Sequence, residues 1–205
     1  MTQLEIMGAN AKNASVFLRT AGSKKDDALL AIAKALREHS DEIIKANEID
    51  IENGKNAGLT ESLLDRLRLT PERINGMAEG VEQVAALADP IGNVLEGRTL
   101  KNGLNIEKVR VPMGVIGIIF EARPNVTFDV FSLCFRSGNV CVLKGGSDAD
   151  FSNRALVRII HSVLERQGIN PAVCTLLPPD REATAELLGA VGFCLLYTSP
   201  SPRDK

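Results

Sequence analysis

The sequence predicts an α/β fold in which a parallel sheet follows a set of helices. Residues 115–120 form an apolar run of β-branched and large side chains that only Gly117 interrupts, and residues 140–143 repeat that pattern. Such runs are typical of strands covered on both faces. A helical segment between them ends at Gly138. Two buried strands joined by a helix predict a right-handed crossover between parallel neighbours.

The first ninety residues have a helical pattern. Ser23 followed by Asp26 resembles a capping box, and Thr60 and the pair Thr70 and Pro71 predict two further helix starts. One apolar helical stripe contains Leu29, Ile32, Ala33, Leu36, Ile43 and Ile44, and a second contains Ile74, Met77, Ala78, Val81 and Ala85. We interpret these helices as packing elements without chemistry.

A hairpin is predicted for residues 91–111. The pair Asn102 and Gly103 is a strong turn signal, and the flanking residues alternate. Neither face of the hairpin is cleanly apolar, which favours a position at a surface or at a subunit edge.

Residues 112–193 continue as βαβ units. Thr127 and Asp129 offer N-cap chemistry for the helix that ends at Gly138. A second unit follows, with a helix over residues 155–164 and a short strand over residues 172–177. Ligands bind at the carboxyl ends of strands in an open parallel sheet. We therefore expect the functional site at residues 121–125 and 144–147.

Composition excludes several classes of function. The chain has 205 residues, a formal net charge of -2, 4% aromatic residues and no tryptophan, which argues against a nucleic-acid partner. No apolar stretch reaches the roughly 20 residues that span a bilayer, and the amino terminus has no hydrophobic signal core. We expect no membrane partner and a cytoplasmic location.

The four cysteines predict neither a zinc site nor a disulfide framework, because none forms a CxxC pair and no histidine stands close in sequence. Cys134 and Cys141 fall within apolar runs and are interpreted as small buried side chains. His39 and His161 have no evident partner for general-base chemistry. No metal is expected.

The motifs IIFEARPNVT and SGNVCVLKGGSD resemble the γ-glutamyl phosphate reductase (glutamate-5-semialdehyde dehydrogenase) family of the aldehyde dehydrogenase superfamily. The segments GLTESLLDRLRLTPERI and ADPIGNVLEGRTLKNGL match the same family, in the expected order. The resemblance covers residues 1–193. It implies an aldehyde-dehydrogenase-like fold with a Rossmann-like, NADP-binding sheet and NADPH-dependent reduction of γ-glutamyl phosphate in proline biosynthesis.

The resemblance also implies roles for the loop after the first strand. Asn125 matches the family asparagine that stabilises an oxyanion, and one such donor contributes about 2.7–4 kcal/mol to lowering a barrier. Arg123 is expected to bind the carboxylate or the acyl phosphate of the substrate. The alternative is that Arg123 pairs with Glu121 and holds the loop. Phe120 and Glu121 are expected to border the cofactor.

The loop after the second strand is expected to hold the cofactor. Lys144 matches the family position that contacts the adenosine ribose or its phosphate, and Gly145 and Gly146 would let the backbone approach the nucleotide. Many relatives that prefer NAD have a glutamate where this chain has Ser147. A neutral side chain beside a lysine favours NADPH over NADH.

Residues 194–205 depart from the family pattern and are interpreted as a foreign tail. Cys194 is therefore not taken as the nucleophile. Because the catalytic domain with its cysteine is expected to lie outside this sequence, we expect the chain alone to have no reductase activity. We expect the full-length protein to form a homo-oligomer and to associate with glutamate 5-kinase.

Two alternatives remain open. The chain could be a non-catalytic nucleotide-binding or interaction module, or it could be the reductase half of a bifunctional kinase and reductase. Met1 beginning directly on the family pattern argues against the second alternative.

Overall fold

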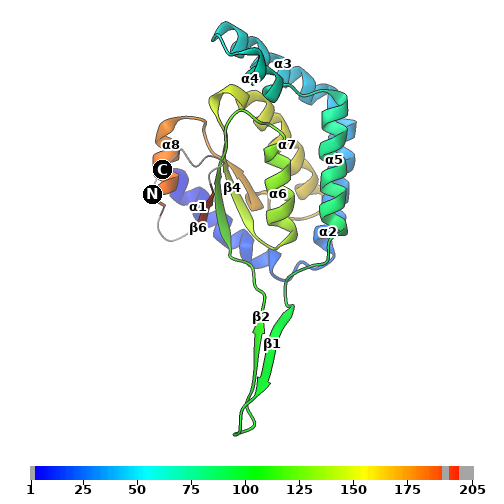
Figure 1. Ribbon diagram of the computed structural model, residues 1–205, viewed down its shortest axis with the longest axis vertical. Helices are drawn as coiled ribbons and strands as arrows, with labels where there is room; N and C mark the ends of the chain where they lie inside the picture. Colours follow the sequence, from blue (N-terminus) through cyan, green and yellow to red (C-terminus); the bar gives the residue numbers. More distant parts are fainter. Residues whose placement is uncertain (1–2, 191–193, 199–205) are drawn as a thin grey trace.

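A four-stranded parallel sheet forms the centre of the molecule (Figure 1). The computed structural model describes residues 3–190 and 194–198. The sheet has the strand order β5-β4-β3-β6, and β3 pairs with β4 in parallel. The strands are β3 (Val115–Ile119), β4 (Val140–Lys144), β5 (Cys174–Leu176) and β6 (Cys194–Thr198). The prediction of a parallel α/β sheet is confirmed.

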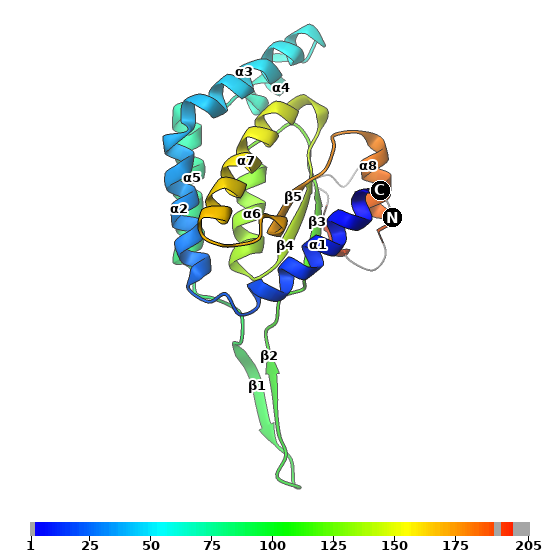
Figure 2. The same ribbon diagram turned by 180° about the vertical axis from the view of Figure 1, so that it is seen from behind.

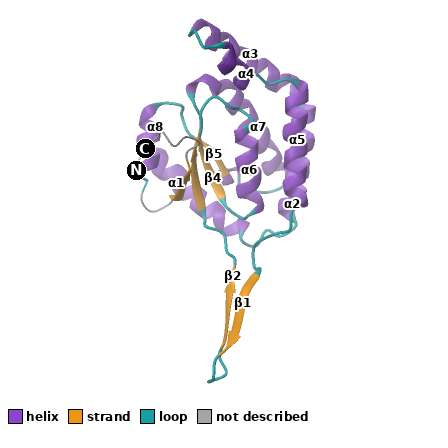
Figure 3. Ribbon diagram, viewed as in Figure 1, coloured by secondary structure: helices purple, strands orange, loops and turns teal. Residues whose placement is uncertain are grey.

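Helices cover both faces of the sheet (Figure 2). The crossover helices lie on one side, and the first and last helices of the described chain lie on the other (Figure 3). They are α6 (Val126–Arg136) and α7 (Asp150–Arg166) on the first side and α1 (Gln3–Leu18) and α8 (Arg181–Leu188) on the second. Two 3-10 turns, η1 (Ser147–Ala149) and η2 (Pro171–Val173), precede α7 and β5. The main core contains residues from all of these layers.

Four more helices stand outside the crossover helices. They are α2 (Lys24–Glu38), α3 (Ser40–Asn56), α4 (Glu61–Leu67) and α5 (Pro71–Ala86). The predicted start at Thr70 and Pro71 is confirmed, because the Thr70 hydroxyl accepts a hydrogen bond from the Arg73 amide at 3.2 Å. Ser23 and Thr60 stand at the N-cap positions of α2 and α4, but neither side chain makes a capping hydrogen bond.

The first apolar stripe belongs to two helices and not to one. The chain breaks at His39, which closes α2 and opens α3. Leu36 and Ile43 are both fully buried on either side of this break. The periodicity could not reveal the break because the apolar spacing continues across it.

The predicted hairpin is confirmed and projects away from the rest of the molecule (Figure 1). Strands β1 (Val94–Thr99) and β2 (Asn105–Val109) are antiparallel, and every residue in them is exposed. Gly103 has φ +83°, a conformation that favours glycine in the turn. The base of the hairpin packs on Gly138, where a Cβ atom would lie 2.5 Å from Ile91 and 2.8 Å from Pro112.

Buried charges tie the hairpin base to the helices. The Lys25 ammonium is fully buried and lies 2.7 Å from a carboxylate oxygen of Asp89 and 3.1 Å from the carbonyl oxygen of Arg136. Arg136 pairs with Asp26 and donates from Nε to the carbonyl oxygen of Leu87 at 3.0 Å. This network, which we call the hairpin-base network, joins α2, α6 and the segment after α5.

The segment predicted to be a foreign tail includes β6, which pairs in parallel with β3. Residues 199–205 lie outside the described residues. The origin of this segment and the boundary at residue 193 stay predictions.

Candidate functional site

The two loops predicted to carry function lie side by side at the carboxyl end of the sheet. The Phe120 amide donates to the carbonyl oxygen of Lys144 at 3.0 Å, which continues the pairing of β3 and β4 beyond Ile119. A Cβ atom on Gly146 would lie 3.4 Å from the Cα atom of Glu121. The backbones of the two loops are therefore in contact.

Lys144 ends β4 with its ammonium turned toward the segment after β5. Its Nζ donates to the carbonyl oxygen of Pro179 at 3.0 Å, and the residue is only 8% exposed. Burial lowers the pKa of Lys144, and the nearby Asp180 carboxylate raises it by less. Buried charges are usually paired with an opposite charge or hydrogen-bonded to several groups, whereas Lys144 has one neutral hydrogen-bond partner.

The first of the two glycines after Lys144 is required by packing. A Cβ atom on Gly145 would lie 2.3 Å from Nδ2 of Asn153, whereas one on Gly146 would be in ordinary van der Waals contact with the Glu121 backbone, at 3.4 Å. Asn153 is buried on α7, and its Oδ1 accepts from the Thr127 hydroxyl at 3.0 Å. Its Nδ2 has no hydrogen-bond partner among the described residues. Ser147 follows the glycines and is exposed at the start of η1.

Asn125 begins α6, so the predicted caps Thr127 and Asp129 are wrong. Asn125 occupies the N-cap position with a helical conformation and no side-chain cap bond. The Thr127 hydroxyl instead bonds Asn153 on α7. The Asp129 carboxylate accepts from Nδ2 of Asn125 at 3.2 Å, which holds the amide in place. Burial raises the pKa of Asp129, and this hydrogen bond opposes the shift.

Arg123 is exposed and, among the described residues, makes no ion pair with Glu121. The alternative in which these two side chains pair to hold the loop has no support in this geometry. The loop is held instead by its backbone, because the Arg123 amide donates to the carbonyl oxygen of Glu121 at 2.7 Å.

Arg123 and Asn125 open onto a cavity of about 410 Å³, which we call the arginine cavity. Its opposite wall comes from α4, α5 and the turn between them. The lining residues are Asp65, Arg66, Arg68, Leu69, Arg73, Gly76, Met77, Arg123, Asn125 and Asp129. Sequence reasoning missed the arginines of α4 and α5, because they precede Asn125 by more than fifty residues and only the fold brings them together.

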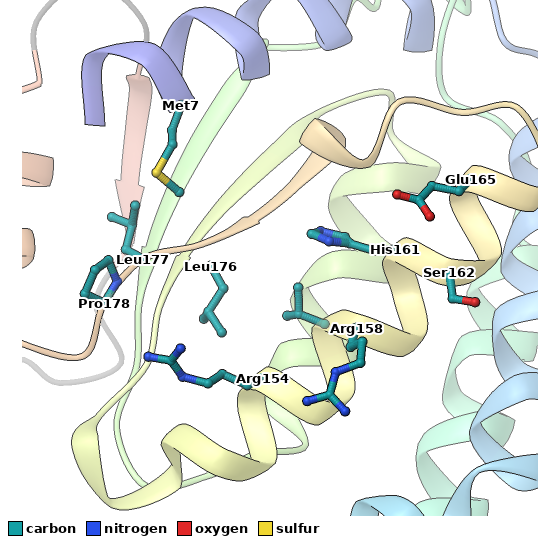
Figure 4. Close-up of a pocket in the computed structure, with 10 residues that line it drawn as sticks. Met7, Arg154, Arg158, His161, Ser162, Glu165, Leu176, Leu177 and Pro178 are labelled. Carbon is teal, nitrogen blue, oxygen red and sulfur yellow. The ribbon is translucent and has the colours of Figure 1, made fainter. Parts of the chain in front are cut away.

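A second cavity, of about 610 Å³, lies between α1, α7 and the segment after β5 (Figure 4). Met7 projects into it from α1, and Arg154, Arg158 and His161 project from α7. Pro178, also in its wall, precedes the proline whose carbonyl holds Lys144. This cavity, which we call the α7 cavity, therefore adjoins the Lys144 loop. His161 Nε2 lies 2.6 Å from the carbonyl oxygen of Cys174, a backbone partner that the sequence did not reveal.

The cysteines with described side chains are unsuited to nucleophilic chemistry. Cys134, Cys141 and Cys174 are free and buried, as predicted for the first two. Burial raises the pKa of Cys134, and hydrogen bonding to Cys174 together with burial raises that of Cys141. Because the thiolate is the reactive form, these shifts keep both thiols inert.

Residues 3–190 and 194–198 contain no group of three or more histidine, cysteine or acidic side chains that could hold a metal ion. Within the same residues, no helix has both the length and the apolar character needed to cross a bilayer.

Comparison with known proteins agrees with this arrangement. The profile described as "Aldehyde dehydrogenase family" matches residues 2–195. The chain belongs to the aldehyde dehydrogenase family. The resemblance of its motifs to γ-glutamyl phosphate reductases is also confirmed, since curated relatives carry that name at up to 68% identity.

Two of these relatives show how much of the chain is matched. The γ-glutamyl phosphate reductase of Parabacteroides distasonis is 68% identical over 161 residues, which are 78% of this chain and 38% of that protein. The enzyme of the same name from Glaesserella parasuis is 47% identical over 190 residues, which are 92% of this chain and 45% of that protein. The chain spans less than half the length of these relatives.

Solved structures give the same result. A γ-glutamyl phosphate reductase from Thermotoga maritima superimposes with a TM-score of 0.95 at 36% identity, covering 99% of this chain and 50% of that one. One from Saccharomyces cerevisiae superimposes with a TM-score of 0.90 at 31% identity, covering 97% of this chain and 51% of that one. The aldehyde-dehydrogenase-like fold class is confirmed.

Proposed function

We propose that this chain is the nucleotide-binding part of an oxidoreductase of proline biosynthesis that reduces γ-glutamyl phosphate to glutamate 5-semialdehyde with NADPH and releases phosphate. One observation carries the proposal. In a chain 68% identical to a γ-glutamyl phosphate reductase, the loop with Arg123 and Asn125 lies against the loop with Lys144 at one edge of the sheet.

The residues of this edge fit a phosphorylated nucleotide. Lys144 is a buried ammonium with a single neutral partner, which a phosphate oxygen could supplement. Arg154 and Arg158 in the adjoining α7 cavity are already paired, with Asp150 and Glu42. Among the described cations next to the α7 cavity, Lys144 makes no ion pair and is available to an added phosphate, and the neutral Ser147 beside it brings no repulsion. These features favour NADPH over NADH.

NADPH, when bound, supplies the hydride of the reaction. The chain itself contributes binding and orientation: Lys144 and Ser147 hold the nucleotide, and Phe120 and Glu121 border it from the neighbouring loop. Gly145 keeps room for Asn153, since a Cβ atom there would lie 2.3 Å from its Nδ2, and Gly146 lets the backbones of the two loops approach closely.

Asn125 acts on the substrate side of the same edge. Its amide donates to the oxygen of the reacting carbonyl as negative charge develops there. Asp129 orients the amide by accepting its second N–H, at 3.2 Å. Arg123, two residues away, offers a guanidinium group to an anionic group of the substrate.

The chain alone is proposed to be inactive. A thiolate must attack the acyl phosphate before hydride transfer, and Cys134, Cys141 and Cys174 are buried with no such role. The fourth cysteine, Cys194, lies in β6, whose side chains are outside the described part of the structure. Turnover of γ-glutamyl phosphate by the purified 205-residue chain would contradict this proposal.

A chimera tests the chemistry. Residues 1–190 would be joined to the carboxyl-terminal half of the Thermotoga maritima reductase, whose structure superimposes with a TM-score of 0.95. We expect NADPH oxidation that depends on γ-glutamyl phosphate, and a loss of about 100-fold to 1,000-fold in kcat for Asn125→Ala. A chimera that folds and binds NADPH but does not turn over γ-glutamyl phosphate would favour the alternative that the chain is a non-catalytic nucleotide-binding module.

A homo-oligomer is proposed for the full-length protein. The hairpin exposes apolar side chains at Leu95, Leu104 and Ile106, which a second subunit would cover. Light scattering of the full-length protein with these three residues changed to serine tests the idea, with a fall in mass expected relative to the unchanged full-length protein. Association with glutamate 5-kinase and a cytoplasmic location stay predictions.

A further inference from the structure

The arginine cavity has the composition of an anion-binding site. Its volume of about 410 Å³ lies within the range of about 300–1,000 Å³ that is usual for small-molecule pockets. Four arginines line it, against two aspartates. They come from two separate segments: Arg123 from the loop before α6, and the others from α4, α5 and the turn between them.

One arginine and both aspartates of this cavity are already engaged. Arg73 donates to the carbonyl oxygen of Arg68 at 2.8 Å and to the Asp65 carboxylate at 3.0 Å. It therefore fixes the turn between α4 and α5 and is a positioning residue. The Asp129 carboxylate accepts from Asn125.

The remaining arginines are available. Arg66, Arg68 and Arg123 are all exposed, and within residues 3–190 and 194–198 none of their guanidinium groups makes a hydrogen bond or an ion pair. Arg66 and Arg68 form one side of the cavity, and Arg123 forms the other with Asn125. The cavity thus offers two separate cationic positions to a ligand.

We propose that Arg66 and Arg68 bind the α-carboxylate of the substrate while Arg123 binds its acyl phosphate. This inference rests on the proposed function and assigns the specificity of that same site. Asn125 fixes the position of the reacting carbonyl, and the phosphate is bonded directly to that carbonyl. Arg123, two residues from Asn125, therefore binds the phosphate.

The α-carboxylate end of the substrate lies against the cavity wall that α4 and its turn form. The α-carboxylate is separated from the reacting carbon by three carbon atoms, so it extends away from Asn125 toward the turn between α4 and α5. Arg68 stands on that turn, held through its carbonyl by Arg73. Guanidinium groups bind carboxylates in bidentate geometry, which gives direction as well as attraction.

The test compares two stable ligands on the 205-residue chain. The first is 5-oxo-6-phosphonohexanoate, in which a methylene group replaces the labile acyl oxygen of γ-glutamyl phosphate and a hydrogen replaces the α-amino group, because a free amine there would condense with the ketone to a pyrroline. The second is 2-oxopentylphosphonate, which is the same molecule without its carboxylate. Isothermal titration should show that removing the carboxylate weakens binding to the unchanged chain by about tenfold or more.

The affinities of protein variants for the two ligands show which arginines bind the carboxylate and which bind the phosphonate. In the double variant Arg66→Gln and Arg68→Gln, both ligands should bind equally weakly, so the advantage of the carboxylate disappears. In Arg123→Gln, both ligands should lose about tenfold while the advantage of the carboxylate remains. Arg166→Gln removes a surface arginine of α7 outside the cavity and should bind both ligands as the unchanged chain does.

Each other outcome overturns the assignment. No saturable binding of either phosphonate, or an unchanged carboxylate advantage in the double variant, would show that α4 and its turn do not read the substrate. A NADPH titration of the same variants separates this failure from failure of the proposed function. If the unchanged chain binds NADPH but neither phosphonate, or if the double variant binds NADPH and keeps the carboxylate advantage, only the arginine assignment is lost.

Discussion

The two ends of the parallel sheet differ in how their buried and clustered cations are paired. At the end that carries the hairpin, Lys25 is fully buried and contacts both a carboxylate and a carbonyl, and Arg136 beside it is paired with Asp26. At the other end, Lys144 is nearly buried, and within the described residues it makes one hydrogen bond, to the carbonyl oxygen of Pro179, and no ion pair, although the Asp180 carboxylate lies nearby. The three available arginines of the arginine cavity stand at this second end.

This difference separates structural charge from functional charge. A buried ion pair that is fully hydrogen-bonded is costly to break and fixes how its elements dock. A cation with few partners contributes little to folding but keeps its capacity for a ligand. The hairpin-base network therefore holds the elements together, and we propose that the cations at the carboxyl end of the sheet bind phosphate and carboxylate groups.

The largest predicted effect is at the structural end. Lys25→Met should lower the free energy of unfolding by about 2–3 kcal/mol, because it leaves the buried Arg136 carbonyl and the partly buried Asp89 carboxylate without their shared partner. Urea denaturation followed by circular dichroism measures the loss. A change below about 1 kcal/mol would show that the network does not hold the fold.

Glycine substitutions sharpen the comparison at the functional end. Gly145→Ala should cost about 1–3 kcal/mol, because the new Cβ atom would lie 2.3 Å from Nδ2 of the buried Asn153. Gly146→Ala is the matched control, since its nearest contact is 3.4 Å and should be tolerated better. Thermal melting of both variants tests this order, and equal melting temperatures would contradict it.

Much of this arrangement could be predicted from sequence because its signals are local. The apolar runs of β3 and β4 and the turn at Asn102 and Gly103 each require only neighbouring residues. The capping prediction for Thr127 failed because the hydroxyl found a tertiary partner, Asn153, that lies on another helix.

The roles of the charged residues were the hardest feature to predict from the sequence. Lys25 stands in the first turn of an amphipathic helix, where a lysine is normally solvated, and only the approach of Asp89 and Arg136 buries it. Arg66 and Arg68 likewise carry no local signal for a site. Their place in the arginine cavity depends on α4 packing near the start of α6, which no spacing in the sequence encodes.

The smallest predicted effect concerns pH. The pKa of Lys144 is lowered by burial from 10.5. Between the lowered value and 10.5 the unfolded chain binds more protons than the folded chain, so folding stability rises with pH across this window. The unchanged chain should therefore gain stability relative to Lys144→Met as pH rises from 7 toward 10.5. Denaturation series at several pH values test this, and a relative loss would contradict the sign.

The most direct measurement is the NADPH affinity of the Lys144→Met variant, determined by fluorescence titration. The Lys25→Arg variant, which keeps its charge, serves as the comparison. We predict that Lys144→Met unfolds at the same or a higher urea concentration than the unchanged chain and binds NADPH at least about tenfold more weakly. A Lys144→Met protein that binds NADPH as tightly as the unchanged chain would contradict the claim that this end of the sheet keeps its cation for the nucleotide.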